Sequence, residues 1–255
     1  MHIETLDTTL VSRQLLTPDT AQLVLHAPGH TFDFEPGQHV GVAYDGADGL
    51  VHRSYSPVSL PGTDTIALMV TRYDNGTCSV WLHEREIGDS VGLTDPSGNL
   101  SLRDLQRDVV FLATGTGLTP MIAMLQAYRQ QSSGRATFLY GERTLNDVPY
   151  REMLNLWAAG TDRMDVTYAL SHPGDTPERI PENGSPSPRG IANIRHGYVQ
   201  THLHHLRDEE TLQTAHFYVC GVPQMVVDTE ETLTNDLGVD EDRVFTEGWE
   251  AGAID

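Results

Sequence analysis

The sharpest chemical signal in the sequence is a glycine turn between two apolar segments. Gly115-Thr116-Gly117-Leu118-Thr119-Pro120 follows the apolar run 109–113 and precedes 121–128, whose composition is typical of a helix. Glycines let the backbone approach a ligand closely, and a helix N-terminus favours a pyrophosphate. A tight structural turn is the alternative, because the third glycine of G-x-G-x-x-G is missing. The strand–turn–helix context favours nucleotide binding.

A second turn of the same kind follows the apolar run 216–220. Its sequence is Cys220-Gly221-Val222-Pro223-Gln224-Met225, so a glycine and a proline again lead into an expected helix. Ligands of open α/β sheets bind at the carboxyl ends of the strands, which is where Cys220 is expected. The alternative is a small buried core residue, as cysteine often is.

Two stretches in the first half of the chain could also hold a phosphorylated ring compound. In Arg53-Ser54-Tyr55-Ser56, the guanidinium suits a diphosphate, the tyrosine offers a flat face, and a serine hydroxyl can bind a heteroatom. Gly76-Thr77-Cys78-Ser79 opens an expected helix and would point backbone N–H groups at an anion. Alone, the first stretch fits an ordinary exposed strand better than a ligand site. The second fits a hairpin turn with a helix cap as well as it fits an anion site.

The elements that must position these residues change character near residue 105. Before it, short alternating runs separated by turn dipeptides predict an antiparallel barrel or sandwich, with strands at 22–26, 38–42, 49–52, 66–70 and 90–93. After it, strands at 109–113, 136–139, 164–170, 216–220 and 244–245 alternate with helices at 150–158, 198–206 and 224–236. This alternation predicts a parallel sheet. We therefore predict domains at 1–104 and 105–255, and a long loop at 173–193.

Composition narrows the function classes. The net charge of −20 comes from 36 acidic residues and 16 basic residues, all of them arginine, which argues against nucleic acid and anionic membrane as partners. Such an acidic, lysine-free surface resembles that of proteins from salt-adapted organisms, and the alternative is an ordinary acidic protein with biased codon usage. Two cysteines cannot hold an iron–sulfur cluster alone, and no histidine spacing predicts a metal site. No apolar run approaches about 20 residues and no leader is evident, so we expect a cytoplasmic protein.

The ordered set of motifs resembles the ferredoxin–NADP reductase superfamily. The motifs are Pro36-Gly37-Gln38, Arg53-x-Tyr55-Ser56, Gly76-x-x-Ser79, Gly115-Thr116-Gly117-x-x-Pro120, Tyr140-Gly141-x-Arg143 and Cys220-Gly221-x-Pro223-x-Met225. They run from about residue 34 to the C-terminus. The resemblance implies a six-stranded FAD-binding barrel followed by an α/β domain that binds NADP or NAD.

The resemblance also implies roles for individual residues. Arg53 would hold the flavin diphosphate, Tyr55 would pack on the isoalloxazine, and Ser56 would bond near flavin N5. The other implied FAD ligands are Gly76, Thr77 and Ser79. The implied dinucleotide ligands are Gly115, Thr116, Gly117, Pro120 and Gly221. Cys220 would lie near the nicotinamide, and Glu247 would handle a proton or position the nicotinamide, so Ser56, Cys220 and Glu247 are the predicted catalytic residues.

Departures from the family pattern bear on the dinucleotide and on the C-terminus. His172 follows Ser171 where NADP-preferring relatives often have arginine. Arg143, Arg189 and Arg195 would flank the adenosine end and Tyr198 would stack on adenine, which favours NADP over NAD. The usual Gly-Pro after the strand at 90–93 is replaced by 95–98. The chain continues past Glu247, and Trp249 would cover the flavin or lie in an exposed tail.

The predicted function is that of a FAD-dependent oxidoreductase that moves electrons between NAD(P)H and a one-electron carrier such as ferredoxin or flavodoxin. The alternatives are a reductase component of an oxygenase, an NAD(P)H:flavin reductase with diffusible flavin, and a non-catalytic flavin-binding module. Arg72, Arg85 and Arg103 are the predicted docking patch for an acidic carrier. We expect a monomer or a weak dimer.

Overall fold

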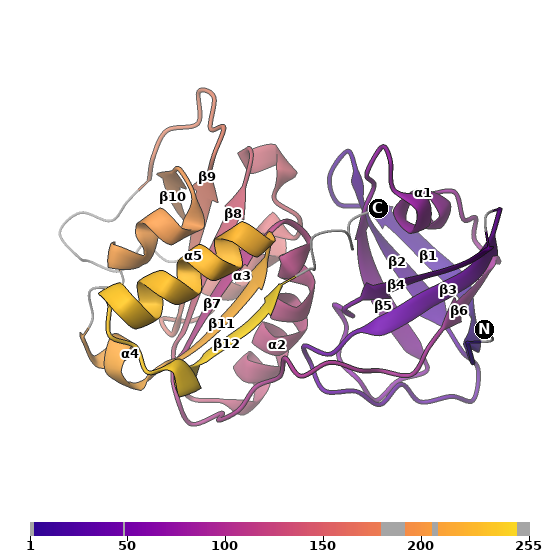
Figure 1. The fold of residues 1–255 in the computed structure, drawn as a ribbon, viewed down its shortest axis with the longest axis horizontal. Coiled ribbons are helices and arrows are strands. Elements are labelled where there is room, and N and C mark those ends of the chain that lie inside the picture. The colour runs from indigo at the N-terminus through magenta and orange to yellow at the C-terminus, as the bar shows by residue number, and fades with distance from the viewer. Residues whose placement is uncertain (1–2, 48, 180–191, 206–208, 249–255) are drawn as a thin grey trace. The chain divides into compact units, whose positions relative to one another are not determined.

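The computed structural model describes residues 3–47, 49–179, 192–205 and 209–248 (Figure 1). The chain divides into two compact units. The first comprises the described residues up to Leu102 together with Thr119–Gln130, and the second comprises Arg103–Leu118 and the described residues from Gln131 to Gly248. Each unit has its own hydrophobic core. The division at residues 104 and 105 stays a prediction.

The first unit is an antiparallel six-stranded sheet, as the alternating pattern predicts. Its strands are β1 (Leu6–Leu15), β2 (Thr20–His26), β3 (Val40–Gly46), β4 (Gly49–Tyr55), β5 (Thr65–Thr71) and β6 (Ser90–Leu93), in the order β4-β3-β6-β1-β2-β5. An isolated bridge between Pro57, just after β4, and Leu68 of β5 links the two edges of the sheet. Helix α1 (Thr77–His83) packs against β4 and β5.

The first strand, β1, is absent from the sequence-based prediction. Only Thr8 and Leu10 are fully buried in its ten residues, and most of the remaining positions are exposed. Its sequence therefore shows no apolar alternation, although it pairs with both β2 and β6.

The second unit is a parallel six-stranded sheet, which confirms the predicted α/β architecture. Its strands are β7 (Val109–Thr114), β8 (Ala136–Glu142), β9 (Met164–Leu170), β10 (Asn193–His196), β11 (His216–Gly221) and β12 (Val244–Gly248), in the order β10-β9-β8-β7-β11-β12. The α-helices of the alternating half are α2 (Leu118–Gln131), α3 (Arg151–Ala159), α4 (Glu209–Thr214) and α5 (Pro223–Glu231). Because all strands run the same way, their carboxyl ends share one edge of the sheet.

Three segments of this unit differ from their prediction. Residues Val199–His205 form a 3-10 helix rather than an α-helix, and α5 ends at Glu231, where one π-helical turn, Thr232–Asp236, follows. Strand β10 begins at Asn193, which the sequence assigns to the long loop. Its four residues, Asn-Ile-Arg-His, carry no strand signal, and pairing with β9 gives the segment its structure.

Candidate active site

The two glycine turns of the sequence lie side by side and are packed into each other. They follow β7 and β11, which are neighbours in the sheet. A Cβ atom on Gly117 would overlap the backbone carbonyl of Cys220, and one on Gly221 would overlap the hydroxyl of Thr114. The backbone N–H of Val222 donates to Thr114 Oγ1 at 3.1 Å. These two glycines are therefore required by backbone packing, before any ligand is considered.

Gly115, in the same turn as Gly117, has a different environment. Its φ is +52°, in the left-handed region, and a Cβ placed on it would meet nothing within 4 Å. The turn continues directly into α2, whose first turn carries no acidic side chain and includes the buried Pro120. Open space beside a glycine backbone at a helix N-terminus fits a phosphate group. Thr116 stands half-buried between the two glycines.

Cys220 and Glu247 occupy paired positions on β11 and β12. Cys220 is buried, and burial followed by the nearby charge of Glu247 raises the pKa of its thiol. The side chain is therefore a neutral thiol at physiological pH, unsuited to act as a thiolate nucleophile. Cys220 is thus a small, neutral, buried side chain beside the interlocked turns, with a half-buried carboxyl group on the next strand.

The residues predicted for the adenosine end follow β8, β9 and β10. The N–H of His172 donates to the carbonyl of Arg143 at 2.7 Å, which brings the exposed Arg143 next to Ser171. Arg195 lies half-buried on β10 and Tyr198 is exposed just beyond it. Trp249 and Arg189 lie outside the described residues.

A carboxylate accompanies these cations. The pKa of Glu178 is lowered, chiefly by the hydrogen bond it accepts from the N–H of His196 at 3.0 Å, and further by charges that include Arg195. Part of the positive charge at this edge is therefore already offset.

In the first unit, the predicted flavin residues stand on β4 and just after it. Arg53 is half-buried and its Nη1 donates to the carbonyl of His52 at 2.9 Å. Tyr55 is partly buried against the hydrophobic core of the sheet, and Ser56 is buried. Arg53 and Tyr55 lie on an extended strand and Ser56 directly follows it, so the chemistry here depends on the side chains rather than on a special backbone shape.

The start of α1 belongs to the same region, because α1 packs against β4. Gly76 is the N-cap residue, with φ −78° and ψ 132°, a conformation open to any residue. The hydroxyl of the buried Ser79 accepts from the N–H of Tyr73 at 3.4 Å, and Thr77 is exposed. These positions can present N–H and hydroxyl groups to an anion, as the sequence predicts.

Positioning residues around α1 escape the sequence motifs. Tyr44 donates to the carbonyl of Thr77 at 3.2 Å and stacks on Trp81, with centroids 4.0 Å apart and rings 6° from parallel. The guanidinium of Arg85 lies 4.5 Å from the Trp81 ring centroid. The sequence shows only that Tyr44 lies close to an expected strand and Trp81 in an expected helix. That is not enough to predict that the two rings stack.

The turn after β7 also makes contacts that the motifs do not specify. Thr114 directly precedes the glycine turn, and the Tyr140 hydroxyl donates to the Gly115 carbonyl at 3.1 Å. Glu142 occupies the unspecified position of Tyr140-Gly141-x-Arg143. The pairing of β7 with β8 brings Tyr140 close to the turn, but the register of that pairing is known only from the structure.

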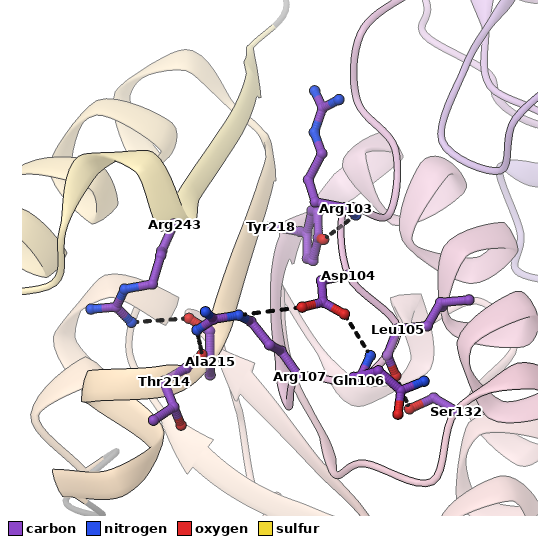
Figure 2. Close-up of polar contacts among 10 residues, drawn as sticks. All are labelled: Arg103, Asp104, Leu105, Gln106, Arg107, Ser132, Thr214, Ala215, Tyr218 and Arg243. Atoms are coloured by element: carbon purple, nitrogen blue, oxygen red, sulfur yellow. Dashed lines mark hydrogen bonds and ion pairs between the residues drawn. The ribbon is translucent and has the colours of Figure 1, made fainter.

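The three arginines of the predicted docking patch have different surroundings. Arg72 is exposed, Arg85 pairs with Asp89 at 3.5 Å, and both belong to the first unit. Arg103 belongs to the second unit. Its backbone N–H donates to Tyr218 Oη at 3.0 Å (Figure 2), and its guanidinium lies 5.4 Å from the Phe245 ring centroid. The patch stays a prediction.

Within the described ranges, no group of three or more histidine, cysteine or acidic side chains could hold a metal ion. Among the helices of the described part of the chain, none is long and apolar enough to cross a membrane.

Family models cover both units. Residues 7–102 match the oxidoreductase FAD-binding domain, and residues 111–231 match the oxidoreductase NAD-binding domain. A protein named ferredoxin–NADP reductase B from Sorangium cellulosum is 33% identical over 259 residues, covering 98% of this chain and 100% of the relative.

Other relatives are longer than this chain. The flavohemoprotein of Bordetella pertussis is 32% identical over 93% of the chain, and the reductase component of propane 2-monooxygenase from Mycolicibacterium goodii is 27% identical over 88%. The matches span 60% and 61% of those two proteins.

Solved structures show the same fold. The FAD/NAD binding domain of nitric oxide dioxygenase from Vibrio cholerae superposes with a TM-score of 0.81 at 22% identity, covering 95% of this chain and 98% of that one. A ferredoxin NADP+ reductase from Neisseria gonorrhoeae gives 0.74 at 19% identity, covering 97% and 99%. This chain belongs to the ferredoxin–NADP reductase superfamily and is a flavoenzyme that uses FAD and NAD(P) for NAD(P)H-dependent electron transfer.

Proposed function

We propose that this chain takes electrons from NADPH and delivers them one at a time, through FAD, to ferredoxin or flavodoxin. The observation that carries the proposal is the pair of interlocked turns after β7 and β11, with an open Gly115 on one and Cys220 on the other. The full-length likeness to a protein named ferredoxin–NADP reductase supports the choice of acceptor.

The predicted flavin residues of the first unit have side chains that suit FAD. Arg53 would bind the diphosphate, Tyr55 would pack on the isoalloxazine, and Ser56 would hydrogen-bond near N5. The N–H groups at Gly76 and the hydroxyls of Thr77 and Ser79 would bind the phosphates. When bound, FAD supplies the conversion between a two-electron hydride donor and a one-electron acceptor.

The second unit suits the dinucleotide. The turn Gly115–Gly117, with Pro120 in the first turn of α2, would hold the pyrophosphate, and Gly221 would let the backbone approach the nicotinamide. Cys220, as a neutral thiol, would pack beside that ring without adding charge, and Glu247 would orient it or hold a proton. The protein's part is thus positioning, which can supply much of a rate enhancement.

NADP is favoured over NAD because the 2′-phosphate of NADP needs a cation and arginines lie near its expected position. Arg143, Arg195 and the hydroxyl of Ser171 would bind it, and Tyr198 would stack on adenine. Glu178 weakens the contribution of Arg195, so Arg143 should contribute more.

The test compares steady-state kcat/KM with NADPH and NADH, using ferredoxin and flavodoxin as acceptors. Arg143→Ala should lower kcat/KM for NADPH about tenfold or more, the size of a charge-assisted hydrogen bond, and leave NADH unchanged. Arg135→Ala, whose guanidinium pairs with Asp165 at 2.9 Å, is the control. A wild-type preference for NADH, or equal losses with both dinucleotides, would contradict the NADP assignment.

A second candidate acceptor is the terminal component of an oxygenase system. The relative named propane 2-monooxygenase reductase component favours it, since it matches 88% of this chain. Turnover with oxygenase components, but with neither ferredoxin nor flavodoxin, would select this candidate.

A further inference from the structure

Glu142 connects the end of β8 to the turn that follows β7. Its Oε2 accepts from the N–H of Arg143 at 2.8 Å, and its Oε1 lies 3.3 Å from the hydroxyl of Tyr140. The same hydroxyl lies 3.1 Å from the carbonyl oxygen of Gly115. One chain of contacts within the second unit therefore links the Glu142 carboxyl group, the Tyr140 hydroxyl and the Gly115 carbonyl.

The surroundings of Glu142 disfavour its charged form. Burial raises the pKa of the carboxyl group, and the nearby Asp147 raises it further. The hydrogen bonds from Arg143 and Tyr140 and the charge of Arg143 act in the opposite direction but are outweighed. Tyr140, Arg143 and Asp147 are the titratable groups that face it. Added negative charge close by would favour the protonated form still more.

The Tyr140 hydroxyl carries a single proton, so it can donate fully to only one of its two acceptors. While Glu142 is ionised, the carboxylate competes with the Gly115 carbonyl for that proton, and a charged acceptor is the stronger one. Once Glu142 is protonated, its own O–H can donate to the Tyr140 oxygen. The tyrosine proton is then committed to Gly115.

We propose that Glu142 is a positioning residue that acts through Tyr140 on the Gly115 turn and takes up one proton when a dinucleotide binds there. The proton comes from solvent and adds to the carboxylate, and no electron moves in this step. The proposal rests on the proposed function, because it places the pyrophosphate of the dinucleotide at this turn. Its consequence is that dinucleotide affinity falls as the pH rises through the titration of Glu142.

The first experiment titrates the holoenzyme with NADP+ by calorimetry between pH 5.5 and 8, in two buffers of different ionisation enthalpy. Glu142→Gln keeps an oxygen acceptor for the Arg143 N–H and offers an amide donor to Tyr140, so it mimics the protonated carboxyl group. At pH 8 this variant should bind NADP+ about threefold to tenfold more tightly than wild type, the size of one hydrogen bond. The difference should vanish toward low pH.

Proton uptake and kinetics give independent readouts. Wild type should take up more protons on binding NADP+ than Glu142→Gln, and comparing the two cancels the titration of the 2′-phosphate itself. Because it should bind the dinucleotide more tightly, Glu142→Gln should lower the KM for NADPH and leave kcat unchanged. Glu152→Gln, which removes an exposed carboxylate on α3, should behave as wild type in every assay.

A double-mutant cycle tests the path through Tyr140. Tyr140→Phe should weaken NADP+ binding about threefold to tenfold, and adding Glu142→Gln to it should then change little. If Glu142→Gln has its full effect in the Tyr140→Phe background, the carboxyl group acts by its charge alone and the relay is overturned. Equal proton uptake in wild type and Glu142→Gln, with normal NADP+ binding, overturns the inference and spares the proposed function. Failure of wild type to bind NADP+ or NAD+ overturns both.

Discussion

The two candidate nucleotide sites of the molecule, one in each unit, are built in different ways. In the second unit, Gly117 and Gly221 are pressed against the backbone and side chain of the neighbouring turn, so the site depends on the path of the main chain. In the first unit, Arg53 and Tyr55 lie on an ordinary strand and Ser56 directly follows it. Gly76 has a backbone conformation that any residue can adopt. The same kind of ligand is therefore expected to be held by backbone shape in one region and by side chains in the other.

Because of this difference, substitutions in the two units should have different effects on folding and on ligand binding. A change in the turns of the second unit should damage folding and binding together, because the glycines satisfy both. A change on β4 should remove binding or rate while the fold survives.

Gly221→Ala should lower the free energy of unfolding of the second unit by about 3 kcal/mol or more. The new Cβ would overlap the Thr114 hydroxyl and meet its carbonyl oxygen at 2.8 Å, at a φ of +148° that side chains rarely adopt. Urea unfolding followed by circular dichroism measures the loss.

Gly115→Ala is the matched control for that substitution. It has a positive φ but open space, so it should cost only about 1 to 2 kcal/mol. Equal losses for the two variants would show that the interlock of the turns contributes nothing to stability.

Arg53→Ala should raise the dissociation constant for FAD about tenfold to hundredfold and leave the stability of the apoprotein nearly unchanged. The reason is the loss of charge-assisted hydrogen bonds to the diphosphate. Fluorescence titration of apoprotein with FAD gives the constant. Arg13→Ala, an exposed arginine on β1, serves as control, and unaltered FAD affinity in Arg53→Ala would remove this residue from the site.

Ser56→Ala should slow flavin reduction by NADPH about fivefold to tenfold while FAD stays bound. One hydrogen bond near the reacting ring is lost, and the fold keeps its buried position filled. Stopped-flow absorbance measures the rate, with Ser54→Ala on β4 for comparison. An unchanged rate would leave Ser56 without a catalytic role.

The smallest expected effect is that of pH on the chemical reactivity of the Cys220 thiol. Because burial and the charge of Glu247 raise the pKa of its thiol, the side chain stays protonated from neutral to mildly alkaline conditions. Iodoacetamide should therefore modify Cys220 in the folded protein no faster at pH 9 than at pH 7, and rapidly after unfolding. Mass spectrometry of tryptic peptides gives the rate, and faster labelling at the higher pH would mean an accessible thiolate.

Sequence reasoning recovered the parts of the molecule that carry strong local signals. The apolar strands around Val109 and Met164 and the antiparallel pattern of the first unit are such cases, and both sheet types are confirmed. Strand β1 was missed because only two of its ten residues are fully buried, and β10 because its polar residues form a strand only through pairing.

The candidate site divides in the same way. Glycine turns are visible as short motifs, so Gly115, Gly117 and Gly221 could be singled out. The contacts of Thr114 with Val222 and of Tyr140 with Gly115 join segments far apart in the sequence, and no spacing along the chain encodes them. The sequence also could not separate the glycine required by packing from the one that leaves open space, because both read as glycine.

The most direct test of an electron path from the dinucleotide to the flavin is an anaerobic titration of the purified protein with NADPH. The absorbance of bound FAD at about 450 nm should bleach in proportion to added NADPH and be complete near one equivalent. It should return when an oxidised one-electron carrier is added. A flavin that stays oxidised after excess NADPH and NADH, in protein that retains FAD, would contradict the account.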